Sequence, residues 1–167
     1  MKQELRKTLL QKRKQIINNN VQIVNNLIPL LSKYKKILLY YPIFNEPNIL
    51  SLMDICDEKT YYLPYTYPDY SEIRKCIDMD DLELDLYNVP TSKVKTVDEV
   101  EVAIVPAVAM NYKKYRLGYG KGYYDKFLKN KNILKIAVVN SEFVIDEEYQ
   151  DEWDVCFDII VTEKEVI

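Results

Sequence analysis

Glycine is confined to a single short stretch of this 167-residue chain, at Gly118, Gly120 and Gly122. Because the other turns use Asn, Asp and Pro, we expect these glycines where the backbone adopts a positive φ or approaches another group closely. The stretch lies between a strand-like apolar run at 102–106 and a helix-like run at 123–128. A glycine loop that opens a helix presents unpaired N–H groups and the positive end of the helix dipole. The pattern therefore favours a bound anion such as phosphate.

Charged side chains flank the glycine loop. Arg116 and Lys121 add two cations, and Asp125 can hold a metal ion that also binds phosphate oxygens. The spacing differs from the dinucleotide-binding fingerprint, and Gly122 stands where a P-loop has Ser or Thr. On spacing alone, a surface turn beside a few charges stays open as an alternative.

Composition indicates one soluble globular domain covering residues 1–167. Apolar residues make up 48% and charged residues 29% of the chain, which is typical of a globular protein with its own core. The net charge of −3 creates no field that would attract nucleic acid, so local cations must hold any anionic ligand. We find no bilayer-spanning run and no signal pattern, and expect a cytoplasmic protein with no membrane partner. The three scattered cysteines are expected to be reduced thiols.

The chain contains no histidine. This excludes nucleophilic mechanisms that use a histidine base and every metal site with imidazole ligands. A bound metal must therefore take oxygen ligands, which indicates a hard cation such as Mg²⁺.

Helical and strand-like patterns alternate along the chain. We expect helices at 2–19, 21–31, 48–57 and 123–130, and strands at 37–41, 60–63, 73–79, 102–105, 134–139 and 158–161. Pro47 is expected in the first turn of the third helix, and Pro64 is expected to end the second strand. The alternation predicts an α/β three-layer sandwich with a mostly parallel sheet and helices on both faces. Ligands bind such sheets at the carboxyl ends of the strands, where the glycine loop should lie.

Four further residues are candidates for this rim. Lys2 and Arg6 share one helix face and can hold a phosphate together, although a solvated helix face has the same pattern. Glu46 follows the first strand, where a ligand group or a surface charge is expected. Asp154 precedes the last strand and can face the same rim as Asp125; an exposed acid in an acidic stretch is the alternative.

The glycine loop in its context resembles the signature of a known enzyme family. The run Arg116-Leu117-Gly118-Tyr119-Gly120-Lys121-Gly122-Tyr123-Tyr124-Asp125, preceded by Val105-Pro106, is similar to the signature of the 5-formyltetrahydrofolate cyclo-ligases. The similarity continues, in order, over nearly the whole length: Lys2 and Arg6, Tyr41-Pro42 through Glu46-Pro47, Leu63-Pro64, and Asp154 through Thr162-Glu163.

The resemblance implies an enzyme that uses ATP and Mg²⁺ to convert 5-formyltetrahydrofolate to 5,10-methenyltetrahydrofolate, releasing ADP and phosphate after phosphorylation of the formyl oxygen. It assigns ATP binding to Lys2, Arg6, Arg116, Gly118, Tyr119, Gly120, Lys121, Gly122, Tyr123 and Tyr124. It assigns folate binding to Glu46, Tyr119, Gly120, Lys121, Gly122 and Tyr123. Charge stabilisation in catalysis falls to Arg116 and Lys121, and the metal to Asp125 and Asp154. The implied partners are ATP and a reduced folate, with the chain acting as a monomer or weak homo-oligomer.

The chain departs from the family pattern at several positions. Trp153 stands where the family often has His, and Tyr87-Asn88-Val89-Pro90 replaces a Gly-Ile-x-Glu-Pro stretch. Pro106-Ala107 and Met110-Asn111 stand for Pro-Gly and Phe-Asp. Two other functions fit the same architecture: a non-catalytic sensor of a phosphorylated ligand, and a relative of sugar-phosphate isomerases or acyltransferases. The sensor needs neither paired metal carboxylates nor Lys121, and the isomerase works without ATP.

Overall fold

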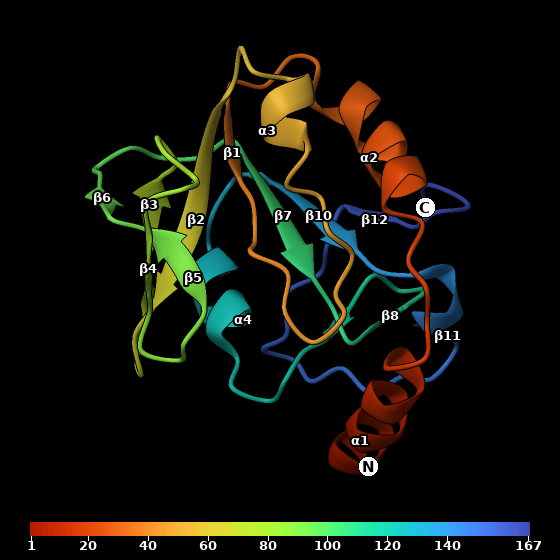
Figure 1. Ribbon diagram of the computed structural model, residues 1–167. Helices are drawn as coiled ribbons and strands as arrows, with labels where there is room; N and C mark the ends of the chain where they lie inside the picture. The colour runs from red at the N-terminus through yellow and green to blue at the C-terminus, as the bar shows by residue number, and fades with distance from the viewer.

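The computed structural model describes residues 1–167 and is built on a seven-stranded sheet in the order β12-β10-β7-β1-β2-β3-β6 (Figure 1). Five neighbouring strands run parallel, namely β1 (Lys36–Leu38), β2 (Thr60–Thr66), β7 (Val102–Pro106), β10 (Leu134–Val138) and β12 (Ile159–Val161). Two antiparallel strands extend one edge, β3 (Ser71–Lys75) and β6 (Val94–Lys95). The prediction of a mostly parallel sheet is confirmed.

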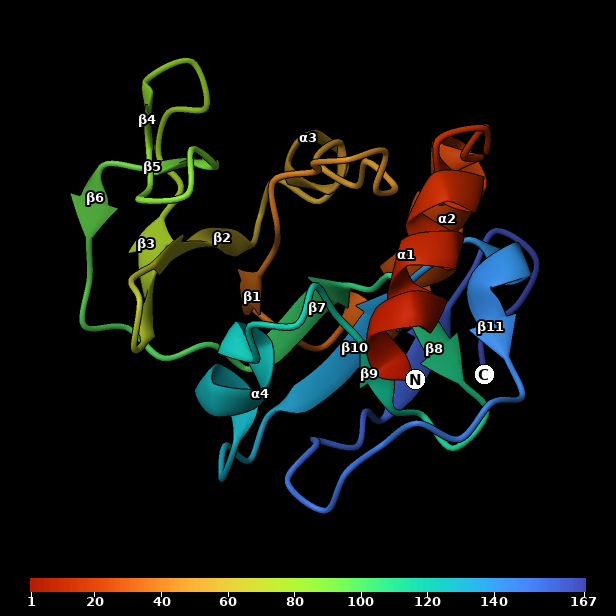
Figure 2. The same cartoon turned by 90° about the horizontal axis from the view of Figure 1, so that it is seen from below.

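Helices cover both faces of this sheet. One face packs against α2 (Asn20–Leu27), the 3₁₀ helix η1 (Ile28–Leu31) and α3 (Leu52–Ile55). The other face packs against α1 (Lys2–Arg13), α4 (Tyr123–Leu128) and a small sheet of β11 (Val144–Ile145), β8 (Ala109–Asn111) and β9 (Arg116–Leu117). In Figure 2, α3 lies above the strands and α4 below them. The predicted three-layer sandwich is confirmed.

The central strand β7 shows why the sequence forms two cores. All five of its residues are buried, and successive side chains point to opposite faces of the sheet. Val102 and Ile104 pack in the core beneath α2 and α3, whereas Ala103 and Val105 pack in the core beneath α1 and α4. A continuous apolar run is what a strand covered on both faces requires.

The strand order positions the site. From β1 the chain adds β2 on one side of the sheet, and later adds β7, β10 and β12 on the other side. The order therefore reverses between β1 and β7, and a crevice opens beyond the carboxyl ends of these two strands. Glu46 follows β1, and the glycine loop follows β9; the two segments meet where the Tyr119 hydroxyl donates a hydrogen bond of 2.8 Å to Glu46 Oε1.

Two predicted helices are shorter than expected. α1 ends at Arg13 and not near residue 19, because the Asn19 side chain caps the next helix by accepting a hydrogen bond from Gln22 N at 3.1 Å. The helix predicted at 48–57 is the single turn α3, so Pro47 does not lie in its first turn. Asn48 instead forms a local turn by accepting a hydrogen bond from Leu50 N at 3.0 Å, which competes with a helix.

Pro64 does not end the second strand, as the sequence led us to expect, because β2 continues to Thr66. Tyr62 O accepts a hydrogen bond from Leu39 N at the end of β1. The backbone groups of alternate residues in a strand point toward the same neighbouring strand, so those of Pro64, like those of Tyr62, point toward β1. Pro64, however, lies beyond the last residue of β1. Its missing N–H is therefore not needed, and the other side of the strand pairs with Ile73 of β3.

The structure corrects two other expectations about strands. β7 does not lead directly into the glycine loop, because the β8–β9 hairpin intervenes and places Arg116 on a strand. The acidic stretch at 80–85, where we predicted no strand, contains β4 (Leu82–Leu84), which pairs with β5 (Pro90–Ser92). The resulting β4–β5 hairpin carries residues 85–89 toward the crevice. No helix combines the length and apolar character needed to cross a bilayer.

Candidate active site

The glycine loop has the backbone conformation that its composition predicts. Gly120 and Gly122 have φ values of +99° and +68°, in the left-handed region that glycine adopts without steric cost. Gly122 is also the N-cap of α4. Gly118 is needed for a different reason, because a Cβ atom there would lie 2.3 Å from Nη1 of Arg116.

The two predicted cations of α1, Lys2 and Arg6, contact segments that are more than 100 residues away in sequence. Arg6 Nε donates a hydrogen bond of 2.5 Å to Gly118 O. Lys2 Nζ forms ion pairs with Asp151 at 2.5 Å and with Asp154 at 3.0 Å. The structure thus brings together the ends of the chain and its glycine loop, as the predicted anion site requires.

A cavity of about 500 Å³, which we call the anion cavity, contains most of the predicted phosphate and metal residues. Its lining includes Lys2, Arg6, Arg116, Gly118, Gly120, Lys121, Gly122, Asp125 and Asp154. Asp151 and Trp153 also line it. Three residues predicted to bind ATP, Tyr119, Tyr123 and Tyr124, do not line this cavity and face a neighbouring one instead.

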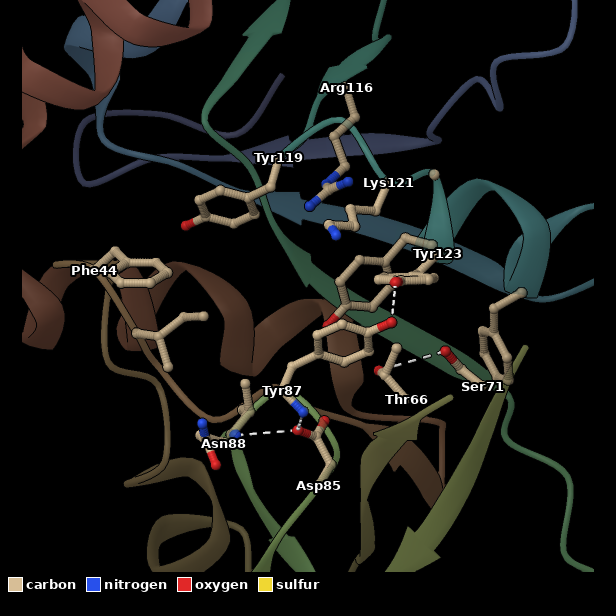
Figure 3. Close-up of a pocket in the computed structure, with 15 residues that line it drawn as sticks. Phe44, Thr66, Ser71, Asp85, Tyr87, Asn88, Arg116, Tyr119, Lys121 and Tyr123 are labelled. Carbon is tan, nitrogen blue, oxygen red and sulfur yellow. Dashed lines mark hydrogen bonds between the residues drawn. The ribbon is translucent and has the colours of Figure 1, made fainter. Parts of the chain in front are cut away.

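That neighbouring cavity, which we call the aromatic cavity, has a volume of about 630 Å³ and is mostly apolar. Its lining includes Ile43, Phe44, Tyr87, Asn88, Val89, Tyr119, Tyr123, Tyr124 and Phe127. Figure 3 shows Arg116 and Lys121 directed from the loop toward Tyr87, whose hydroxyl is hydrogen-bonded to that of Tyr123. Arg116, Lys121 and Gly122 line both cavities, so the two spaces share a cationic wall.

The Arg116 guanidinium is held in place on this wall. Its Nε donates a hydrogen bond of 2.6 Å to Pro106 O, at the end of β7. Its Cζ lies 4.9 Å from the centre of the Tyr124 ring, in a cation–π contact. Burial, and secondly the like charge of Arg116, lower the pKa of Arg6. Two neighbouring cations without a carboxylate partner favour an anionic ligand.

Asp125, on α4, and Asp154, before β12, both line the anion cavity. Burial raises the pKa of Asp125, and the charge of Asp154 adds to this effect. The Asp125 carboxylate accepts one hydrogen bond, from Val155 N at 3.2 Å. No three Asp, Glu, Cys or His side chains come close enough to hold a metal ion by themselves. The two carboxylates therefore suit a hard cation that completes its shell with phosphate oxygens.

Glu46 is buried and does not line the aromatic cavity; it lines a separate cavity of about 450 Å³ together with Ile43 and Phe44. Its Oε1 accepts a hydrogen bond of 2.8 Å from the Tyr119 hydroxyl, and its Oε2 accepts one of 3.1 Å from Ile43 N. Burial raises the pKa of Glu46, while these two hydrogen bonds and the charges of Arg13 and Arg116 oppose the rise. Glu46 thus reaches the aromatic cavity through Tyr119. Gly120, also predicted to contact folate, lines only the anion cavity.

Sequence reasoning missed several residues of the site. Asp151 belongs to the acidic stretch around Asp154, and it lines the anion cavity and forms an ion pair with Lys2. Tyr87 was noted only as a departure from a family pattern, and it forms a wall of the aromatic cavity. Arg13 is buried and donates a hydrogen bond to the Tyr119 hydroxyl. Its position seven residues after Arg6, on the same helix face, was a signal that could have identified it.

The sequence profile of the 5-formyltetrahydrofolate cyclo-ligase family matches residues 1–163. The chain belongs to this family. It is 30% identical over 134 residues to a 5-formyltetrahydrofolate cyclo-ligase of Mycoplasma pneumoniae, covering 78% of this chain and 74% of that protein. A cyclo-ligase of Mycoplasma genitalium is 29% identical over 133 residues.

Solved structures of the cyclo-ligase family share the fold. The 5,10-methenyltetrahydrofolate synthetase of Aquifex aeolicus matches with a TM-score of 0.86 and 32% identity, over 99% of this chain and 91% of that one. A 5,10-methenyltetrahydrofolate synthetase of Mycoplasma pneumoniae matches with a TM-score of 0.73 and 28% identity, over 97% and 98% of the two chains. The resemblance drawn from the glycine loop is confirmed, and the chain is an enzyme of the cyclo-ligase type. The sensor and isomerase alternatives are not supported.

Proposed function

We propose that the two cavities bind the two substrates of the cyclo-ligase reaction, in which ATP drives the conversion of 5-formyltetrahydrofolate to 5,10-methenyltetrahydrofolate. The observation that carries this proposal is the shared wall, because Arg116 and Lys121 line both cavities. A phosphoryl group that passes from one substrate to the other must cross such a boundary. Cations placed there can stabilise its charge throughout the transfer.

The anion cavity suits the triphosphate of ATP. Lys2, Arg6 and Lys121 supply cations, and the loop around Gly120 supplies backbone N–H groups. Asp125 and Asp154 would hold Mg²⁺ together with phosphate oxygens. When bound, the ion would neutralise part of the phosphate charge and help to align the γ-phosphate. In the free chain, Lys2 pairs with Asp154, and this pair must rearrange to release the carboxylate for the metal.

The aromatic cavity suits the reduced folate. The rings of Phe44, Tyr87, Tyr119 and Tyr123 offer surfaces against which a flat pterin and a benzoyl ring can pack. The Glu46 carboxylate behind Tyr119 is an acceptor for the N–H groups of the pterin, either through the Tyr119 hydroxyl or directly once that hydroxyl moves. Polar recognition in a mostly apolar cavity is typical of small-molecule sites.

The reaction needs a shaped and charged site, and no protein nucleophile. The formyl oxygen attacks the γ-phosphorus and ADP leaves, which makes the formyl carbon electrophilic. N10 then attacks that carbon and loses its proton, and phosphate leaves with the former formyl oxygen to give the methenyl bridge. The absence of histidine is compatible with this sequence of steps. Arg116 and Lys121 act by positioning and by charge stabilisation, and loss of one such donor typically costs about 3 kcal/mol, or roughly a hundredfold in rate.

One chain is sufficient for this proposed site, because both cavities are formed within it. We propose that the enzyme acts as a monomer or weak homo-oligomer, with no nucleic-acid or membrane partner. The cysteines Cys56, Cys76 and Cys156 are all free thiols, which fits a reducing compartment such as the cytoplasm.

A turnover assay tests the proposed function. Purified protein with 5-formyltetrahydrofolate, ATP and Mg²⁺ should accumulate the methenyl chromophore, and omission of ATP or addition of a chelator should abolish the signal. Lys121→Met should lower kcat by about a hundredfold. Lys33→Met, which removes an exposed lysine outside both cavities, serves as the matched control and should match the wild type. Product formation at the same rate without ATP would refute the proposal.

A further inference from the structure

Arg13 is a buried cation that lines neither the anion cavity nor the aromatic cavity. Only 4% of its surface is exposed. Its Nη1 donates a hydrogen bond of 3.2 Å to Ala107 O, and its Nη2 donates one to the Tyr119 hydroxyl. That hydroxyl donates in turn to Glu46 Oε1 at 2.8 Å. Burying an arginine is costly unless its charge is compensated. Here Arg13 forms no direct ion pair, its Nε has no hydrogen-bond partner, and it reaches the Glu46 carboxylate only through one phenol.

The helix α1 carries Arg13 in a fixed relation to the proposed phosphate site. Arg13 follows Arg6 by seven residues and Lys2 by eleven, which are close to two and three helical turns. All three side chains therefore project from one face of the helix. Lys2 and Arg6 line the anion cavity, while Arg13 reaches the wall that separates Glu46 from the aromatic cavity.

The charged and titratable groups around Glu46 come from every element that packs against it. They are Tyr40 after β1, Arg116 on β9, Tyr119 in the loop, Tyr124 on α4, and Arg13 on α1. Only the two arginines among them carry a positive charge. Arg116 lines both cavities and can be engaged by a bound anion, whereas Arg13 lines neither and is left to compensate the charge of Glu46.

We infer that Arg13 is a positioning residue, which fixes the Tyr119 hydroxyl and through it keeps the Glu46 carboxylate oriented and ionised for the folate. The identity of that ligand rests on the proposed function. The contact with Ala107 O, at the end of β7, anchors the guanidinium so that Tyr119 receives its N–H from a defined direction. The competing interpretation is a purely structural role, in which Arg13 only ties α1 to β7.

Two substitutions and a control separate these roles. Arg13→Met removes the charge at similar length, Arg13→Lys keeps the charge, and Lys12→Met removes the neighbouring exposed charge, whose partner Glu142 is also exposed. The first measurement is the titration of the Glu46 carboxyl carbon by NMR in the ligand-free protein. Arg13→Met should raise the pKa of Glu46, because the carboxylate loses a cation and a firmly oriented donor. Arg13→Lys should restore much of the wild-type titration, and Lys12→Met should leave it unchanged.

Steady-state kinetics provide the second measurement. Arg13→Met should raise the KM for 5-formyltetrahydrofolate by about tenfold at neutral pH, which is typical for loss of one charge-assisted hydrogen bond. The increase should shrink as the pH rises, because a carboxylate with a raised pKa is again ionised there. The KM for ATP should change by less than about twofold, since Arg13 does not line the anion cavity. An unchanged Glu46 titration, or equal changes in both KM values, would overturn the inference.

Tyr119→Phe tests the route of the effect. This variant removes the hydroxyl that joins Arg13 to Glu46, so it should also raise the pKa of Glu46. In the double variant Arg13→Met/Tyr119→Phe, the increase in folate KM should be much smaller than the product of the two single increases. An increase equal to that product would overturn the inference. If Arg13→Met does not fold, the same titration of Glu46 in Tyr119→Phe and Arg13→Lys tests the inference. The titration requires no turnover, so failure of the proposed function and failure of this inference are separate results.

Discussion

Replacement of Gly118 by alanine should displace the Arg116 guanidinium while leaving the arginine itself in the sequence. An ideal Cβ at position 118 would lie 2.3 Å from Nη1 of Arg116 and 3.0 Å from its Cζ. Since non-bonded atoms rest about 3.5 Å apart, the guanidinium must retreat by about 1 Å. The backbone at Gly118 is not in the left-handed region, so alanine brings no conformational strain of its own.

The magnitude follows from what Arg116 would lose. Its Nε bond to Pro106 O and its contact with the Tyr124 ring both depend on the present position. A misplacement of about 1 Å in a catalytic constellation costs about a hundredfold in rate, so kcat/KM for the methenyl product should fall by about that factor. The fold should survive. The lost charged hydrogen bond costs about 1.5–3 kcal/mol, and alanine returns about 0.4–1 kcal/mol through the unfolded chain.

The assay combines turnover, measured from the methenyl absorbance, with urea unfolding. Arg116→Met is the reference variant, because it removes the group that Gly118→Ala is expected to move. If alanine at position 118 acts through Arg116, the double variant should be no slower than Arg116→Met alone. A wild-type kcat/KM in Gly118→Ala would refute the reasoning. A double variant in which the loss of kcat/KM equals the product of the two single losses would also refute it.

Three further predictions concern the metal carboxylates and the aromatic cavity. Asp125→Asn and Asp154→Asn should each raise the Mg²⁺ concentration for half-maximal rate by about tenfold or more, since tenfold is the lower end of the cost of one lost contact to a charged group; metal titrations identical to the wild type would contradict the assignment. Burial raises the pKa of Asp125 above its ordinary 3.8, so the folded protein favours the protonated carboxyl. The protonated carboxyl therefore stabilises the fold at low pH, and this stabilisation is lost as the pH rises through the pKa of the folded state. Asp125→Asn should therefore increase resistance to urea at pH 7, with the gain vanishing below pH 3.8, and a variant less stable at both pH values would contradict it. Tyr87→Ala, which removes a ring packed against Tyr123 and near Lys121, should raise the folate KM by about tenfold with ATP KM unchanged, whereas Tyr87→Phe should have a smaller effect.

The sequence predicted the elements whose pattern is local. The apolar runs that became β7 and β10 are buried on both faces, and such a run is legible without tertiary information. Predictions failed where side chains compete with the backbone or where a strand ends. Asn48 replaced an expected helix by a turn, and Pro64 stayed within β2 because β1 ends before it. The Pro64 result cannot be read from propensity, since it depends on where a neighbouring strand ends, whereas the Asn48 turn is a local competition between a side chain and the backbone.

By itself, the sequence determined the kind of chemistry: a glycine loop with Arg116 and Lys121, oxygen ligands for any metal, and no imidazole. Tertiary structure alone decided which of these residues share a cavity. Lys2 meets Asp154 across 152 positions of sequence, and Arg13 reaches Glu46 through Tyr119. The physical reason is that strand order and helix docking set these distances. Strand order and helix docking follow from burial of the whole chain, which no local pattern records.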